Sequence, residues 1–136
     1  MDQLSYAIFA LFIISASLSV IFIMTWAAFD RPSHSLTWSI CFAVGAMQWG
    51  FNIADSYGIW SSPYFYWCVV SILGPLVPVL GLVGYQQRAG LQLNIPLLSS
   101  IVFGAFAAAL WFRFVDRHLG LSAATLPFVT IPVSLW

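Results

Sequence analysis

The stretch LSYAIFALFIISASLSVIFIMTWAAF, residues 4–29, decides the fold class, because it is long, apolar and free of charge. At about 1.5 Å per residue, a helix of this length crosses a ~30 Å hydrocarbon core with length to spare. A cleaved signal peptide has a shorter apolar region, roughly 7–15 residues, and a basic region in front of it. No basic residue precedes residue 4. We therefore interpret residues 4–29 as a retained membrane helix.

The composition of the whole chain supports this interpretation. Of 136 residues, 62% are hydrophobic and only 6% are charged, with four basic and four acidic side chains in total. Typical soluble domains are about 25% charged, because polar groups must cover their surface. So few charges cannot coat a globule of this size. The sequence therefore predicts an all-α integral membrane protein whose surface is solvated mostly by lipid.

Three further apolar runs have the length of membrane helices, roughly 20 residues each. They cover residues 36–54, 64–85 and 95–112. Residues 121–136 are also uncharged but are broken by Pro127 and Pro132. We expect a partial fifth helix there, with a short re-entrant or interfacial segment as the alternative. The prediction is one domain, residues 1–136, built as a bundle of four transmembrane helices plus a partial fifth.

Capping residues mark the expected helix ends. Ser35 is a candidate N-cap for the second helix and Asn94 for the fourth, since both side chains accept hydrogen bonds from free backbone N–H groups. Gly90 follows the third helix, where a left-handed residue often ends a helix.

The basic residues give a preference for orientation. Arg31 and Arg88 fall in loops on one side, whereas Arg113 and Arg117 follow the fourth helix on the other, with Asp116 partly offsetting them. The count is two on each side. The expectation of an outside N-terminus therefore rests on the acidic tail and on the loop positions.

The chain lacks the groups that most membrane chemistries require. There is no lysine for a retinal Schiff base and no glutamate for proton coupling. His34 and His118 fall in loops on opposite sides, and Cys41 and Cys68 lie in different helices without paired spacing. We predict no catalytic residue, no cofactor, no metal site and no nucleic-acid partner, so this chain alone is not expected to be an enzyme.

One polar face and one proline-rich segment are the candidate functional features. Gln48, Asn52 and Asp55 are spaced by four and three residues and share one face of the second helix. These residues have two possible roles: they bind a ligand or sense a signal, or they only pack helices together. The third helix contains a candidate hinge at Gly74, Pro75 and Pro78. Proline removes an internal hydrogen bond, so this segment is either a conformational hinge or a fixed bend.

Small residues suggest close helix packing, because they let helix backbones approach one another. The second helix carries Ala46 and Gly50, and the fourth carries Ser100, Gly104 and Ala108. The sequence does not distinguish whether these small residues pack within the bundle or between two copies in a dimer.

Four segments together resemble the N-terminal membrane region of bacterial GGDEF-type diguanylate cyclases. They are WAAFDRP at residues 26–32, LTW at 36–38, GYQQRAG at 84–90 and WFRFVD at 111–116. In that family an aromatic and basic turn follows the first helix, and the third helix ends in a glycine and a basic turn. The patterns are loose, although they extend over most of the chain.

The resemblance implies a sensor or anchor module in the bacterial inner membrane, acting as a homodimer or with other membrane subunits. Such proteins carry a cytoplasmic domain that makes cyclic di-GMP from two GTP molecules. This sequence contains no GGDEF motif, so it cannot carry out that reaction. A small structural or assembly subunit of a larger membrane complex is the competing hypothesis. A small transporter is less favoured, because none of the four expected spans has a charge at its centre.

Overall fold

The computed structural model describes residues 3–92 and 94–114, and this part of the chain folds into four α-helices. They are α1 (Gln3–Ala28), α2 (Ser33–Ser56), α3 (Pro63–Ala89) and α4 (Ile95–Phe114). No strand occurs in the described residues, which confirms the all-helical class. The expected ranges were 4–29, 36–54, 64–85 and 95–112. The expected fifth segment, residues 121–136, lies outside the described residues.

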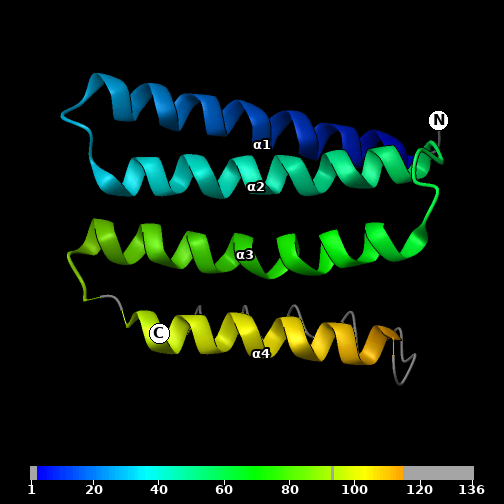
Figure 1. Ribbon diagram of the computed structural model, residues 1–136. Coiled ribbons are helices and arrows are strands. Elements are labelled where there is room, and N and C mark those ends of the chain that lie inside the picture. Colours follow the sequence, from blue (N-terminus) through cyan, green and yellow to red (C-terminus); the bar gives the residue numbers. More distant parts are fainter. Residues whose placement is uncertain (1–2, 93, 115–136) are drawn as a thin grey trace.

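The four helices run antiparallel in a row that follows the chain order (Figure 1). α2 packs on α1 and on α3, whereas α4 contacts α3 less extensively. Within the described residues α1 touches neither α3 nor α4, so the row is not closed into a ring. Lipid is as apolar as the helix surfaces, so no hydrophobic force drives membrane helices to close up.

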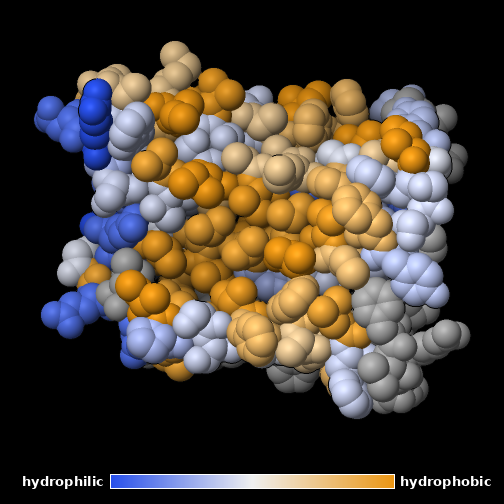
Figure 2. Space-filling model, in the orientation of Figure 1, coloured by the Kyte–Doolittle hydropathy of each residue, from blue (hydrophilic) through white to orange (hydrophobic). Residues whose placement is uncertain are grey.

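Three of the helices are long and apolar enough to cross a membrane. Their candidate spans are Ser5–Ala28, Tyr64–Ala89 and Ile95–Phe112. α2 has 24 residues but includes polar side chains such as Gln48 and Asn52, and it does not reach the same hydropathy. Hydrophobic side chains cover the middle of the row, and hydrophilic ones gather at the end with the α1–α2 and α3–α4 turns (Figure 2).

The helix ends correct one expectation and confirm another. α2 begins at Ser33, directly after Pro32, so the prediction that Ser35 caps this helix is wrong. Ser35 lies inside the helix and is buried. Asn94 does cap α4, because its Oδ1 accepts a hydrogen bond from the Leu97 N–H at 3.2 Å. Gly90 ends α3 in the left-handed conformation with φ of 68°.

Candidate functional site

α3 is attached to α2 by three hydrogen bonds at different depths. Near the α2–α3 turn, the Tyr66 hydroxyl donates to Asn52 Oδ1 at 2.5 Å. In the middle, Cys41 Sγ donates to the Val77 carbonyl at 3.3 Å. At the opposite end, the Thr37 hydroxyl lies 2.7 Å from Gln87 Oε1 and donates to it. Because these bonds are spread along the helix, they fix both the rotation and the register of α3 against α2.

The proline-containing segment of α3 lies at the centre of this interface. Gly74 and Pro75 are buried and Pro78 is half-buried, and the helix continues through all three residues. The two prolines have no N–H, so the carbonyls four residues earlier lose their usual helical donors. The segment is therefore weaker in internal hydrogen bonds than the rest of α3. The Cys41 thiol ties it to α2 through the adjacent Val77 carbonyl.

Trp38 of α2 connects three helices. Its ring stacks with Phe22 of α1 and with Phe42, at centroid distances of 6.1 and 6.0 Å. On the other side it lies against α3 at Gly84, where an added Cβ would come within 2.9 Å of Trp38 Nε1. Only glycine leaves room for this ring, so Gly84 sets the distance between α2 and α3. The sequence alone does not indicate that Trp38 packs against Gly84.

The predicted polar face of α2 does not converge on one site. Asn52 is engaged by Tyr66 of α3, and Gln48 is half-buried. Asp55 is exposed in the last turn of the helix. The structure thus brings Asn52 into the α2–α3 interface and leaves Asp55 in the open.

An aromatic cluster closes the turn between α2 and α3. Trp60 stacks on Phe51 at 4.9 Å and contacts Phe65 at 5.4 Å. Its indole N–H donates to the Phe51 carbonyl at 3.4 Å. These rings pack on one another, so they serve to hold the turn rather than to line a cavity.

Small and hydroxyl side chains form the contact between α1 and α2. Ser19 and Ser39 each donate to the other's backbone carbonyl at 2.9 Å. Gly50 faces Phe12, whose ring would lie 3.5 Å from an added Cβ. Ala46 is 8% exposed. The two small residues of α2 therefore lie in regions of close packing.

The small residues of α4 have a different environment. Ser100 and Gly104 are exposed, and a Cβ added at Gly104 would meet nothing within 4 Å. Ala108 is half-buried. Within the described residues no helix packs on the face that Gly104 presents.

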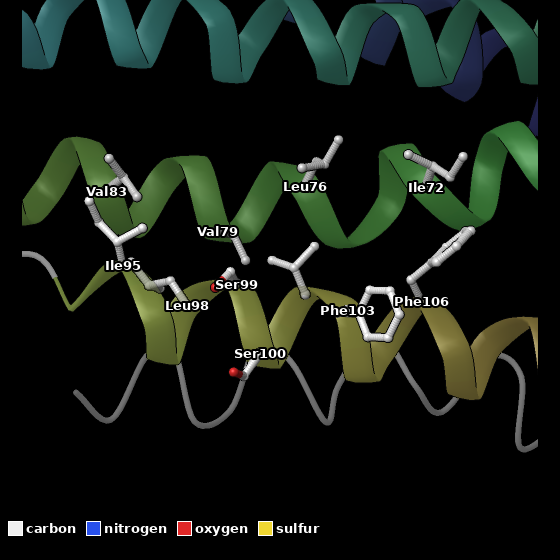
Figure 3. A pocket seen from close by; sticks show the side chains of 11 residues that line it. Ile72, Leu76, Val79, Val83, Ile95, Leu98, Ser99, Ser100, Phe103 and Phe106 are labelled. Atoms are coloured by element: carbon white, nitrogen blue, oxygen red, sulfur yellow. The ribbon is translucent and has the colours of Figure 1, made fainter.

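An apolar groove of about 950 Å³ runs between α3 and α4, and we call it the α3–α4 groove (Figure 3). One wall is formed by α3 from Ile72 to Val83, and the other by α4 from Ile95 to Phe106. The polar groups in its lining are those of Ser99 and Ser100. Its α3 wall includes residues on both sides of the candidate hinge.

Gln86 is a buried polar side chain beyond the groove, in the last turns of α3. It is 4% exposed, and its Oε1 accepts no hydrogen bond in the part of the chain that the structure describes. An unpaired buried acceptor costs about 1–3 kcal/mol. The sequence prediction had placed this residue only in a basic turn.

The described residues contain no group of three or more His, Cys, Asp or Glu side chains that could hold a metal ion. His34 is half-buried at the start of α2, while His118 lies outside the described residues. Cys41 and Cys68 are free thiols. Comparisons with protein-family models, with curated proteins and with solved structures find no match to this chain.

Proposed function

We propose that this chain is the membrane-embedded sensor or anchor module of a bacterial signalling protein of the diguanylate cyclase type. It lies in the inner membrane as a multi-pass protein, and its N-terminus faces outside. The catalytic domain of such a protein is not part of this sequence.

The arrangement of the helices supports membrane crossing by α2 as well as by its neighbours. α2 lies antiparallel between α1 and α3, both of which are apolar enough to span (Figure 1). Two of its polar groups are turned toward those neighbours: Ser39 is bonded to α1, and Asn52 to α3. Interhelical hydrogen bonds of this kind are common within membrane proteins. They account for a spanning helix whose overall hydropathy is lower.

The positions of the basic residues support the orientation. The α1–α2 and α3–α4 turns lie at the same end of the row (Figure 1). Arg31 belongs to the first turn, and Arg88 to the last turn of α3 at that end. Positive residues favour the cytoplasmic side. α1 begins at the other end of the row, where Arg113 lies near the end of α4, so the proposed outside N-terminus rests on the two turns and on the acidic tail rather than on the number of basic residues.

The single observation that carries the sensor proposal is the unequal attachment of α3. Hydrogen bonds and the Trp38–Gly84 contact hold it on α2, whereas its α4 side is apolar and bordered by an open groove. The proline-containing segment lies between the two sides. A signal acts by stabilising one of two arrangements more than the other. A shift of α4 relative to α3 breaks none of the three hydrogen bonds between α2 and α3, so it should cost less than a shift of α3 relative to α2.

Purification of the protein from its native host in mild detergent, followed by mass spectrometry, tests this proposal. We expect peptides that continue past Trp136 into a GGDEF domain on the same polypeptide. A stoichiometric set of other membrane subunits, with no such peptides, would contradict it. Reading the coding sequence beyond the codon for Trp136 gives the same decision independently.

A structural or assembly subunit is the second candidate, and one observation favours it. No residue of the described part of the chain packs on the α4 face around Gly104, and small residues on a membrane helix commonly receive another helix. The same purification separates the candidates, because an assembly subunit is recovered with its partners in fixed proportion. A homodimer is compatible with either function.

A further inference from the structure

The turn between α2 and α3 folds back along α2 instead of projecting from its end. Trp60 stacks on Phe51 and donates its indole N–H to the Phe51 carbonyl. Phe51 lies five residues before Ser56, the last residue of α2, which is about 7.5 Å back along the helix axis. The turn therefore stays near the level at which the two helices end.

The lengths of α2 and α3 place this level within the headgroup region of a bilayer. α2 has 24 residues and α3 has 27, which correspond to about 36 and 40 Å along the helix axis. A bilayer is about 40–45 Å thick with its headgroup regions included. Upright helices of these lengths end inside the headgroup regions, and tilted helices end deeper. The α2–α3 turn begins at that depth.

Exposed tyrosine or tryptophan side chains lie at this end of all four helices (Figure 1). They are Tyr6 at the start of α1, Tyr57 directly after α2, Tyr64 at the start of α3 and Trp111 near the end of α4. The candidate spans begin at Ser5 and Tyr64 and end at Phe112, so these side chains mark the limits of the spans. Such rings favour the membrane–water interface, because one end is apolar and the other is polar. A bilayer meets all four helices at one level, whereas a protein partner needs only a local patch.

The α2–α3 turn also exposes apolar side chains. Ile59 is 65% exposed, and Phe65, which contacts Trp60, is exposed as well. Phe65 belongs to the third helix's candidate span, so the apolar surface of the turn continues into a surface that faces lipid in a membrane. On the face that Figure 2 shows, the strongly hydrophilic side chains gather at the opposite end of the row. Exposed apolar surface of this kind marks contact with a membrane or a protein, and its continuity with a span favours the membrane.

We propose that the α2–α3 turn lies in the boundary between the headgroups and the acyl chains of its leaflet, with Ile59 immersed in lipid. This rests on the proposed membrane insertion of the helices, but not on any downstream cyclase domain. The headgroup side of the boundary is polar, so it accommodates the exposed carboxylate of Asp55, which needs hydration. Lipid covers a turn at this depth, so a signal that acts on this end of α3 arrives through the lipid rather than as a water-soluble ligand.

Fluorescence quenching of the full chain in phosphatidylcholine nanodiscs tests the proposal. Both faces of a nanodisc are open to solvent, and one chain per disc prevents contact with a second copy. Ile59→Cys and Gln92→Cys are each labelled with bimane, and the unsubstituted chain gives the background from Cys41 and Cys68. Gln92 is the control position, because it is an exposed polar residue in the turn at the opposite end of the row.

We expect lipid with bromine near the headgroup end of its acyl chains to quench the label at residue 59. Aqueous iodide should quench that label several-fold less than the label at residue 92. Tyr57→Cys provides a second position in the same turn, in case the substitution of Ile59 disturbs folding.

Two results overturn the proposal. Iodide quenching at residue 59 as strong as at residue 92, without quenching by brominated lipid, means that the turn stands in water. Protection from both quenchers means that protein covers the turn. Failure of the chain to enter nanodiscs contradicts the membrane placement in the proposed function, whereas an inserted chain with a turn in water contradicts the depth of the turn alone.

Discussion

The two sides of α3 (Pro63–Ala89) are built from different interactions. Toward α2 it carries three hydrogen bonds at separate depths and a glycine that receives the Trp38 ring. Toward α4 it presents aliphatic side chains around Val79 and Leu82, which pack on Leu98. Hydrogen bonds have fixed donors and acceptors, so they specify one register. Aliphatic contacts in lipid do not define the helix register as closely, because the surrounding lipid is equally apolar.

The largest expected effect comes from closing the space that Trp38 uses. Gly84→Ala brings a methyl group within 2.9 Å of Trp38 Nε1, and Phe22 and Phe42 on the other side hinder the ring from moving away. Overpacking of this kind costs about 1–3 kcal/mol. Unfolding in detergent micelles measures it.

Gly104→Ala on α4 is the matched control, because among residues 3–92 and 94–114 nothing lies within 4 Å of its added methyl group. Both substitutions gain the same helix propensity, so their difference isolates the contact with Trp38. We expect Gly84→Ala to be the less stable of the two. Equal stabilities would mean that Trp38 does not hold α2 and α3 at this distance.

The next largest effect is expected from the bond between Tyr66 and Asn52. Tyr66→Phe removes the donor and leaves Asn52 Oδ1 without this partner. Hydrogen bonds between membrane helices contribute about 0.6 kcal/mol on average and up to about 1.7. The free energy of unfolding should fall by an amount in that range. Because the bond is only 2.5 Å long and Tyr66 is 7% exposed, we expect the upper part.

Tyr57→Phe is the control, since this tyrosine is 67% exposed after the end of α2. Its effect should lie within about 0.5 kcal/mol of zero. A double-mutant cycle with Asn52→Ala then gives the coupling energy. A coupling energy of zero would contradict a bond that holds the two helices in register.

These contrasts also show what the sequence can and cannot predict. The helices α1, α3 and α4 follow from apolar length and the absence of charge, because a membrane requires both. The capping role of Asn94 could be predicted from its side chain and its position before the helix, and the structure confirms it. Ser35 was predicted wrongly, because α2 starts just after Pro32 and the serine becomes a buried interior residue.

The partners of polar side chains depend on helix rotation, which no local pattern gives. Gln48, Asn52 and Asp55 share a face by spacing, yet only Asn52 of the three has an interhelical hydrogen bond in the described part of the chain. Thr37 and Gln87 are fifty residues apart, and nothing near either one indicates the other. Helix periodicity is also weak where a helix is apolar on every side, so the groove between α3 and α4 could not be predicted.

The smallest expected effect compares two adjacent glutamines at the end of α3. Gln87→Leu removes the α3 acceptor of Thr37 and leaves that hydroxyl its second acceptor, the Ser33 carbonyl at 3.1 Å. The substitution should lower the free energy of unfolding by about 0.6 kcal/mol. Gln86→Leu removes a buried Oε1 that has no partner in the described residues, so it should leave stability unchanged or raise it by about 1 kcal/mol.

The opposite signs are informative because the two substitutions are chemically identical and one residue apart. A helix rotates by about 100° per residue, so these side chains point to different surroundings. If Gln86→Leu destabilises the protein as much as Gln87→Leu does, then Gln86 has a donor in the membrane, from a lipid headgroup or another helix. Its effect would then depend on lipid composition or on protein concentration, and repeating the unfolding experiment with each varied in turn identifies the donor.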